Sequence, residues 1–400
     1  MVATKLVWTT VLIAFAEALG ADPGVTDKEI KIGNIMPYSG PASAYGTIGR
    51  GITAYFKRLN EEGGINGRKV NIISYDDGYS PPRAVEQARR LVEQDRVLFI
   101  FQPLGTAPNS AIWKYMNDKQ VPQLFVASGA TKWGDPTGHP WTMGWQPTYQ
   151  TEAGIYAQYL LKNRPAAKIA VLYQNDDFGK DYLKGLRDGL GPAAAKMIIA
   201  EQSYEVSDPT VDSQMVNLKN SGADVFLNIS TPKFALQAIK KAADLGWKPL
   251  QILTNVATSL ATVMTPAGTE ASKGIISAFY LKDYDDPQWK DDPATREWLG
   301  WMKKYYPDGN LHEQFNIYAY SVSQTLVQVL KQAGNDLSRA NVMKQAANLK
   351  DLTLPMLLPG IKVNTGPNDF FPIEQERLAR FDGQRWVLFG ELIDASNNRI

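Results

Sequence analysis

Two short polar segments carry the side chains and backbone amides best suited to bind a small anion. Residues 102–108 and 128–131 each follow an apolar, strand-like run of the sequence. Thr106 stands at a predicted helix N-cap, in front of free backbone N–H groups that favour negative charge. The second segment offers small residues with exposed amides, namely Gly129, Ala130 and Thr131. Either segment alone is an ordinary turn, but on neighbouring strands the two predict a cradle for a carboxylate group.

Residues for catalysis or metal binding are scarce in this chain. There is no cysteine, which excludes disulfides and thiol chemistry, and the two histidines, His139 and His312, lie far apart in sequence. The glycines of residues 46–51 lack the spacing of a dinucleotide-binding loop and the lysine of a P-loop. The acidic pairs at 76–77 and 176–177 are typical of caps and turns. We therefore expect no enzyme activity, no metal and no cofactor.

The composition is that of a soluble globular protein. The 400 residues suffice for two domains of ordinary size, and 44% of them are hydrophobic and 21% charged. The formal net charge of +1 gives no electrostatic reason to bind nucleic acid or an anionic membrane surface. We expect no nucleic-acid partner.

Residues 1–21 have the layout of a secretory signal peptide. Lys5 precedes the apolar run 6–16, and small residues follow up to a cleavage point near Gly20 or Ala21. The run is shorter than the ~18 apolar residues that a membrane-spanning helix needs, and no later stretch reaches that length. We expect export to the periplasm. The alternative is an N-terminal segment that is disordered or packed into the core.

Strand-like and helix-like segments alternate in two successive series, which predicts an α/β protein of two lobes with largely parallel sheets. The first series has strands at 30–35, 70–74, 97–101 and 123–127, and helices at 44–60, 80–93 and 107–118. The second has strands at 168–173, 197–199, 225–229 and 251–254, and helices at 152–161, 180–190, 213–221 and 233–245. The last third fits neither series, with helices at 296–306 and 319–333 and a strand at 385–389. A ligand is expected beyond the carboxyl ends of the strands.

Two turn-rich segments carry a resemblance to a known family. The sequences MPYSGP at 36–41 and NEEGGINGRK at 60–69 resemble the start of the periplasmic leucine/isoleucine/valine-binding proteins, which capture solutes for ABC importers. The resemblance implies a two-lobe, Venus-flytrap fold in which the chain crosses between the lobes three times, near 142–144, 277–281 and 354–358. The implied N-terminal lobe is 28–142 plus 282–354, and the implied C-terminal lobe is 145–276 plus 358–400.

The resemblance also assigns roles to individual residues. It implies that Thr106 and the loop of Gly129, Ala130 and Thr131 bind the carboxylate of the solute. The sequence NDDFG at 175–179 matches a family motif that puts Phe178 against the ligand, and Tyr45 matches an aromatic residue at the pocket rim. Family members often carry a disulfide at the positions of Tyr79 and Gly105, where this tyrosine could pack over the glycine instead.

Two differences from the family bear on the ligand. The acidic residue that receives the ligand ammonium corresponds to Asn255, and Thr231 stands where an aromatic residue is common. A neutral amide does not offset the desolvation of an ammonium group, which costs several kcal/mol. We therefore expect a solute with a carboxylate and no α-amino group. Trp145 belongs to an aromatic cluster at the first crossing, where it either shapes the apolar end of the pocket or packs the hinge.

The expected function is that of a periplasmic solute-binding protein. It would close around a small carboxylate-bearing solute and deliver it to the membrane permease of an ABC importer. The expected solute is an organic acid, aromatic or aliphatic, or a hydrophobic amino acid. Two alternatives stay open: binding of branched-chain amino acids specifically, and a ligand-sensing regulator of the same fold, as in amide sensors.

Overall fold

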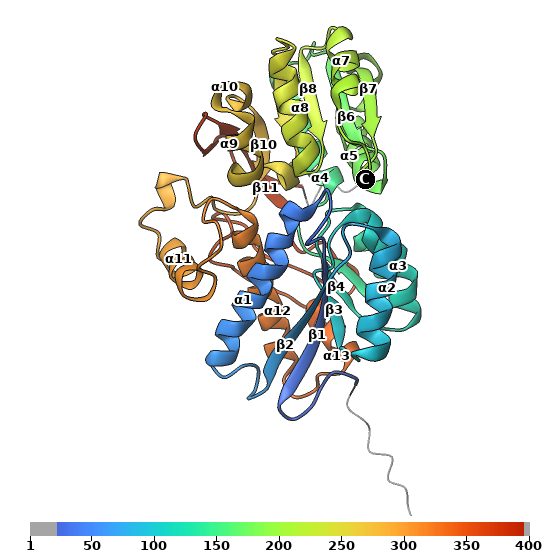
Figure 1. The fold of residues 1–400 in the computed structure, drawn as a ribbon, viewed down its shortest axis with the longest axis vertical. Helices are drawn as coiled ribbons and strands as arrows, with labels where there is room; N and C mark the ends of the chain where they lie inside the picture. The colour runs from blue at the N-terminus through green and yellow to red at the C-terminus, as the bar shows by residue number, and fades with distance from the viewer. Residues whose placement is uncertain (1–21, 396–400) are drawn as a thin grey trace, which may run out of the picture.

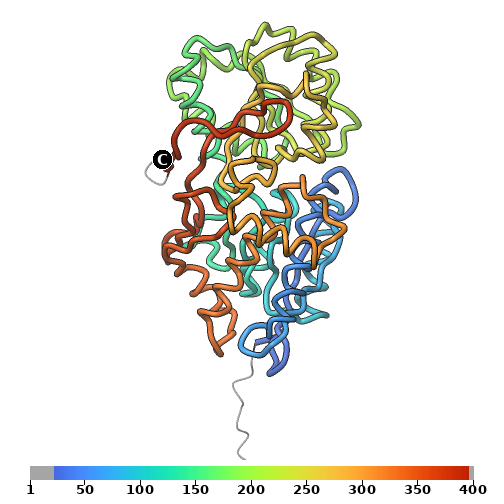
Figure 2. The backbone as a smooth tube through the Cα atoms, turned by 90° about the vertical axis from the view of Figure 1, so that its left-hand side faces the viewer, coloured from blue at the N-terminus to red at the C-terminus, as the bar shows by residue number. Residues whose placement is uncertain are grey.

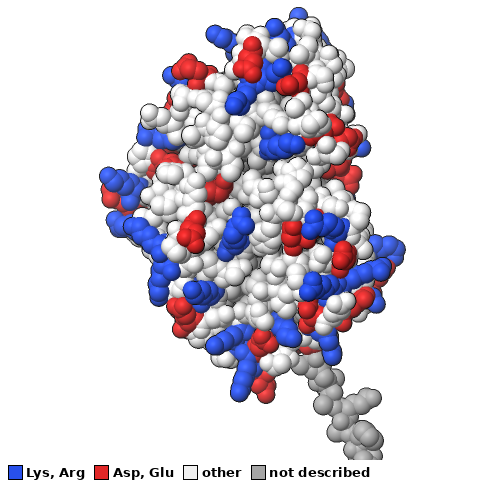
Figure 3. All heavy atoms as spheres, in the orientation of Figure 1, with Lys and Arg blue, Asp and Glu red and all other residues white. Residues whose placement is uncertain are grey.

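The computed structural model describes residues 22–395, so the predicted signal peptide at 1–21 lies outside the described residues. Figure 1 shows two lobes arranged along the long axis, with the earliest strands and the helices near residue 300 together in the lower lobe. Figure 2 shows the C-terminal segment running along one side from the lower lobe to the upper one. Acidic and basic side chains are interspersed over the face shown in Figure 3, in keeping with the net charge of +1.

The first lobe is built on a five-stranded parallel sheet with the strand order β2-β1-β3-β4-β5. Its strands are β1 (Glu29–Met36), β2 (Lys69–Asp76), β3 (Phe99–Phe101), β4 (Gln123–Val126) and β5 (Thr142–Gly144). Helices α1 (Gly46–Glu61), α2 (Pro81–Arg89) and α3 (Thr106–Asp118) come from the same stretch of chain. Helices α11 (Pro293–Tyr305), α12 (Phe315–Ala333) and α13 (Arg339–Ala346) come from much later in the sequence, and α12 packs against α1.

The second lobe is built on a mixed sheet with the order β12-β11-β10-β9-β8-β6-β7, in which β13 also pairs with β11. Strands β6 (Ile169–Gln174), β7 (Ile198–Tyr204), β8 (Val225–Ile229), β9 (Leu250–Leu253) and β10 (Ile276–Phe279) are parallel, whereas β11 (Gln375–Phe381), β12 (Trp386–Leu388) and β13 (Ile393–Asp394) pair antiparallel. Its helices are α4 (Tyr149–Asn163), α5 (Asp177–Leu190), α6 (Ala194–Met197), α7 (Asp212–Asn220), α8 (Pro232–Asp244), α9 (Thr265–Ala267) and α10 (Thr269–Ser272).

Short 3-10 or π-helical turns complete both lobes. They are η1 (Ser43–Tyr45), η2 (Arg90–Gln94), η3 (Thr131–Gly134), η4 (Gly191–Ala193), η5 (Asn255–Ala257), η6 (Leu260–Met264) and η7 (Pro287–Trp289).

The predicted two-lobe α/β architecture is confirmed, and every predicted strand and helix has a counterpart within a few residues. The sequence analysis missed β5, β10, β11, α13 and the helical turns between residues 260 and 272. The first two are only three and four residues long, and β11 interleaves charged with apolar residues. Short or charge-interrupted strands show too little periodicity to be recognised.

The chain passes between the sheets in three places. It leaves the first sheet after Gly144, returns after Phe279, and enters the second sheet again before Gln375. The second passage lies beside a later segment, because Lys282 N donates to Met356 O (2.8 Å) and Leu358 N donates to Tyr280 O (2.9 Å). The lobe boundaries implied by the resemblance stay a prediction.

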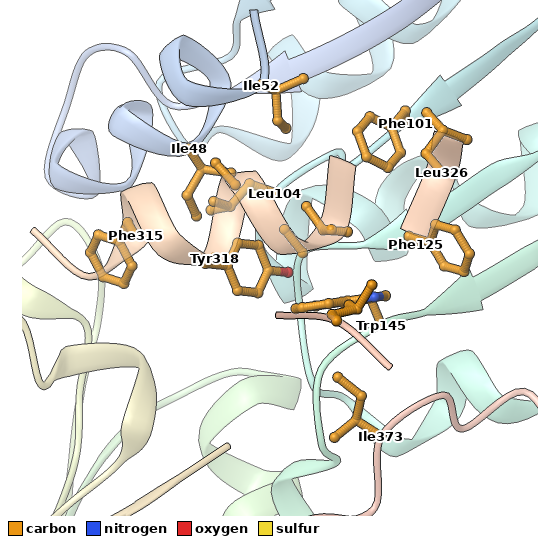
Figure 4. Close-up of a cluster of buried hydrophobic side chains, with 14 of the residues drawn as sticks. Ile48, Ile52, Phe101, Leu104, Phe125, Trp145, Phe315, Tyr318, Leu326 and Ile373 are labelled. Atoms are coloured by element: carbon orange, nitrogen blue, oxygen red, sulfur yellow. The ribbon is translucent and has the colours of Figure 1, made fainter. Parts of the chain in front are cut away.

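The indole of Trp145 joins the first passage to helix α12. Trp145 is fully buried, and its Nε1 donates to Thr325 Oγ1 at 3.0 Å. Its ring meets Tyr318 edge-on at 5.1 Å and Tyr280, from the second passage, at 6.1 Å. Figure 4 shows Tyr318 and Trp145 side by side, next to Ile48 and Leu104. A single core therefore holds together elements that are far apart in sequence.

Replacing Trp145 should destabilise the whole molecule. We expect Trp145→Ala to lower the free energy of unfolding by about 3–5 kcal/mol, because it leaves a large cavity between the two passages. Trp145→Phe keeps more of the volume and should cost less. Urea unfolding followed by circular dichroism measures both, with Leu161→Ala at a partly exposed site as the control. A loss below about 1 kcal/mol for Trp145→Ala would contradict this role of the indole.

Candidate ligand-binding site

A pocket lies between the two lobes, where the carboxyl ends of strands from both sheets meet. The first lobe contributes Tyr45, Ile48, Tyr79, Leu104, Gly105 and Ala127, and the start of α12 contributes Gln314, Phe315 and Tyr318. The second lobe contributes Tyr149, Phe178, Thr231, Asn255, Val256 and Phe279. The passages between the lobes add Gln146, Tyr280, Leu281, Lys282 and Asp283. The pocket is therefore complete only when both lobes are in contact.

Aromatic rings dominate the wall of this pocket. Eight of its lining residues are tyrosine or phenylalanine: Tyr45, Tyr79, Tyr149, Phe178, Phe279, Tyr280, Phe315 and Tyr318. Rings from different elements meet edge-on, with Tyr45 at 5.1 Å from Phe315 and Tyr149 at 5.2 Å from Phe178. Such a wall favours a flat or apolar solute, because aromatic faces and edges pack against other rings.

Four of the predicted site residues line the pocket: Tyr45, Phe178, Thr231 and Asn255. Asn255 is held on two sides. Its Nδ2 donates to Ala278 O (2.6 Å), and its backbone N–H donates to Glu152 Oε1 (2.8 Å). One N–H of the side-chain amide is engaged, so its second N–H and the side-chain oxygen are left for a ligand. The hydroxyl of Tyr45 donates across the cleft to Val256 O at 2.9 Å.

A buried carboxylate fixes the position of Asn255. Glu152 on α4 accepts hydrogen bonds from the hydroxyls of Tyr156 (2.6 Å) and Tyr182 (2.7 Å) as well as from Asn255. Burial raises the pKa of Glu152 and of the neighbouring Glu376. Glu376 has no hydrogen-bond partner among the described residues, so the proton of the pair belongs on Glu376 and the charge on Glu152.

The predicted carboxylate cradle lies beside the pocket rather than in its lining. Thr106 is the first residue of α3 and Gly105 is the N-cap, so the predicted cap position was wrong by one residue. The Thr106 hydroxyl is buried and hydrogen-bonds with Ser128 Oγ at 2.7 Å. Gly129 packs against the hinge, where an added Cβ would lie 2.5 Å from Pro147 O, and Ala130 is also buried.

Thr131 is used in a contact between the lobes. Its backbone N–H and its hydroxyl both donate to Asp181 Oδ2 on α5, at 2.8 and 3.0 Å. The next residue, Lys132, forms an ion pair with Asp177 at 2.6 Å. Trp145 stands behind Tyr280 and Tyr318, which line the pocket in its place. The binding roles of Thr106, residues 129–131 and Trp145 stay predictions.

A second set of contacts closes the other side of the cleft. Glu313, just before α12, accepts hydrogen bonds from the hydroxyls of Ser259 (2.7 Å) and Thr262 (3.5 Å) of the second lobe. Gln314 donates to Thr258 Oγ1 and to Asn255 O. Burial raises the pKa of Glu313 to about 7, since no cation faces it to offset the loss of solvent. The described conformation is therefore a closed one.

The sequence analysis missed the contribution of the last third of the chain. Tyr280, Lys282 and Asp283 come from the second passage, and Phe315 and Tyr318 come from α12. Lys282 forms an ion pair with Asp292 at 2.8 Å, and burial raises the pKa of Asp283 to about 7. The many aromatic residues of these segments were the one local sign of a contribution to the pocket. Their position beside it depends on contacts between residues more than a hundred positions apart, which local patterns do not contain.

The expected packing of Tyr79 over Gly105 is confirmed. A Cβ added to Gly105 would lie 2.4 Å from Cε2 of the Tyr79 ring, so only glycine fits at this position. Gly105 also has a φ of 98°, which side chains rarely adopt. The pair was recognised from the sequence, but its place in the pocket wall was not.

The two histidines lie in separate local contacts. His139 stacks on Trp113 at 3.5 Å, and His312 pairs with Asp285 at 2.6 Å. Among residues 22–395, no group of three or more histidine, aspartate or glutamate side chains is arranged to hold a metal ion. Over the same residues, no helix has the length and apolar character needed to cross a membrane.

Comparisons with known proteins agree with this geometry. The family described as periplasmic binding protein matches residues 29–385. Among curated relatives, Leu/Ile/Val-binding protein homolog 7 of Brucella abortus is 24% identical, with 92% of each chain covered. Homolog 1 of the same species is 27% identical over 86% of this chain and 90% of its own.

Solved structures share the fold at low sequence identity. A branched-chain amino acid ABC transporter protein of Thermus thermophilus with bound valine superposes with a TM-score of 0.82 at 15% identity, covering 93% of this chain and 98% of its own. A fatty acid ABC transporter substrate-binding protein of Thermomonospora curvata gives 0.76 at 21% identity, covering 94% and 95%. Both the strand order and these neighbours identify the two-lobe, Venus-flytrap architecture. The chain belongs to the periplasmic binding protein family.

Proposed function

We propose that this protein is the solute-binding component of an ABC importer and that it captures a small organic acid with a flat, apolar body in the periplasm. The observation that carries the proposal is the pocket wall, in which eight aromatic rings from both lobes surround one space. Curated relatives are named as Leu/Ile/Val-binding protein homologues, and one structural neighbour is named as a fatty acid ABC transporter substrate-binding protein. The compounds in these names are all apolar molecules with a carboxylate. The permease of the importer would recognise the closed form.

Solute binding would be coupled to closure of the lobes. A ligand in the pocket touches both lobes only when they are closed, so binding shifts the population toward the closed form. Polar contacts that bridge the cleft include Tyr45 with Val256, Thr131 with Asp181 and Glu313 with Ser259. Contacts of this kind contribute about 0.5–1.5 kcal/mol each.

The polar groups of the pocket support a carboxylate without an α-amino group. Gly105 brings the N-terminus of α3 to the pocket wall, where the helix dipole favours negative charge. The buried hydroxyl of Tyr318 has no hydrogen-bond partner among the described residues and is free to donate to an anion. At the far end, Asn255 presents an amide in place of an acid. It offers a hydrogen-bond acceptor but no charge for an ammonium group.

A second candidate ligand is a branched-chain or other hydrophobic amino acid. Asp283 lines the pocket, and its Oδ2 has no hydrogen-bond partner within the described part of the chain. This carboxylate could replace the family acid that corresponds to Asn255.

A regulator of the same fold is a weaker candidate, because residues 1–21 carry the signal-peptide pattern. An N-terminus processed near Asp22 would distinguish an exported protein from such a regulator.

A thermal-shift panel on refolded, ligand-free protein tests the proposed ligand class. The panel compares aromatic carboxylates, aliphatic carboxylates, and leucine, isoleucine and valine. A true ligand at a hundred times its dissociation constant adds about 2.7 kcal/mol of stability, so a hit should be plain. We expect stabilisation by an aromatic acid that lacks an amino group. If only the amino acids stabilise the protein, the interpretation that Asn255 selects a solute without an amino group is wrong, and Asp283 becomes the candidate partner of the ammonium group.

Solute affinity should fall as the pH rises toward neutrality, because of Glu313. Its pKa rises from 4.5 to about 7 on burial against the second lobe, so the closed form holds a proton that the open form releases in this range. Between pH 4.5 and 7 the closed form binds more protons, and raising the pH therefore disfavours closure.

The variant Glu313→Gln isolates this effect. We expect a flatter dependence of the dissociation constant on pH, measured by isothermal titration calorimetry from pH 5 to pH 8 with the best ligand of the panel. Glu270→Gln, at an exposed glutamate of α10, is the matched control and should keep the wild-type dependence. An unchanged pH profile in Glu313→Gln would exclude Glu313 as the titrating group.

A further inference from the structure

Tyr79 occupies an unusual position in the pocket wall. It lies in the loop between β2 and α2 and is buried, with 7% of its surface exposed. Its ring rests on Gly105 and lines the pocket together with it. The ring therefore lies against the N-cap of α3 at one end of the pocket.

The backbone of Tyr79 is held in a conformation that costs free energy. Its φ of 63° is in the left-handed region, which residues other than glycine, asparagine and aspartate seldom adopt. Asp77 maintains this conformation, since its Oδ1 accepts the backbone N–H of Tyr79 at 2.8 Å. Asp77 is itself buried. The loop thus fixes where the ring points and gives it little freedom to move aside.

The Tyr79 side chain lies near the second lobe, where its neighbour is Gln174, the last residue of β6. Gln174 is itself held in place, because its Nε2 donates to Asp176 Oδ2 (2.6 Å) and its Oε1 accepts from the hydroxyl of Tyr204 (3.2 Å). The Tyr79 side chain thus packs on the N-cap of α3 and lies near a fixed amide of the second lobe.

We propose that Tyr79 is the specificity-determining residue at the α3 end of the pocket, where its ring, packed on Gly105, sets the length of solute that fits. This inference rests on the proposed function and narrows its ligand class to short acids. A solute that projects past the ring would have to displace it from Gly105.

A series of phenyl-substituted acids of increasing chain length tests the proposal. Isothermal titration calorimetry with benzoate, phenylacetate, 3-phenylpropanoate and 4-phenylbutanoate gives the length preference of the wild type, Tyr79→Ala and Tyr79→Leu. We expect the wild type to favour the shorter acids. Both variants should shift the ratio of affinities toward the longer acids by roughly tenfold or more, the effect of one or two methylenes in an apolar pocket. The leucine variant covers the case in which the alanine variant does not fold.

Two control variants separate length selection from general damage. Tyr79→Phe keeps the ring and loses only the hydroxyl, so it should leave the order of the acids unchanged. Tyr55→Ala removes a partly buried tyrosine that packs on Trp301 and Tyr320, outside the pocket, and should also keep the wild-type order. The same length order in Tyr79→Ala and Tyr79→Leu as in the wild type would overturn the proposal.

A second experiment does not depend on the ligand class. Tyr79→Ala leaves a space of the size of the lost phenol ring, which 4-methylphenol should fill. This probe should therefore raise the melting temperature of Tyr79→Ala but not that of the wild type or of Tyr79→Phe. If none of the acids binds the wild type, the proposed ligand class fails, and the 4-methylphenol result alone decides whether Tyr79 limits the pocket. A folded Tyr79→Ala that gains nothing from the probe would refute the placement of the ring.

Discussion

The buried contact between the Trp145 indole and helix α12 is the constraint on which the rest of the structure depends. It joins the first passage between the lobes to an element that begins 170 residues later, through one hydrogen bond to Thr325 and edge-on packing with Tyr318. Tyr280 of the second passage packs on the same indole. Because Tyr280 and Tyr318 turn their other sides to the pocket, the packing of the hinge and the shape of the ligand site are set by the same residues.

Closure of the lobes relies on contacts that are individually weak. The ion pair between Lys132 and Asp177 is partly exposed, and such pairs contribute little net free energy in water. Glu313 loses its hydration on closure and gains only hydroxyl and amide partners, so its burial opposes closure once it is ionised. Polar contacts of this strength suit a protein that must bind a solute, close, and open again at the membrane.

The sequence predicted the fold better than the site. Alternating strands and helices were enough for the two parallel sheets, because each element buries an apolar face that is visible in local periodicity. Tyr45, Phe178, Thr231 and Asn255 follow strands or precede helices at recognisable turns, and they do line the pocket. Thr106 and Thr131 also follow strands, but the structure uses their hydroxyls in contacts with Ser128 and Asp181. Which neighbour takes a hydroxyl depends on tertiary contacts that a local motif does not contain. The contributions of α12 and of the second passage to the pocket were missed for the same reason, because they too depend on tertiary contacts.

Native mass spectrometry of the protein purified without unfolding tests directly whether the aromatic pocket between the lobes binds an organic acid. A pocket that both lobes enclose should retain its solute through purification, and denaturation should release one small molecule per chain. We expect the released molecule to be an aromatic acid without an amino group. Release of leucine, isoleucine or valine would contradict the predicted ligand class, and a protein that neither retains a solute nor rebinds any acid would contradict the assignment of the aromatic pocket as the binding site.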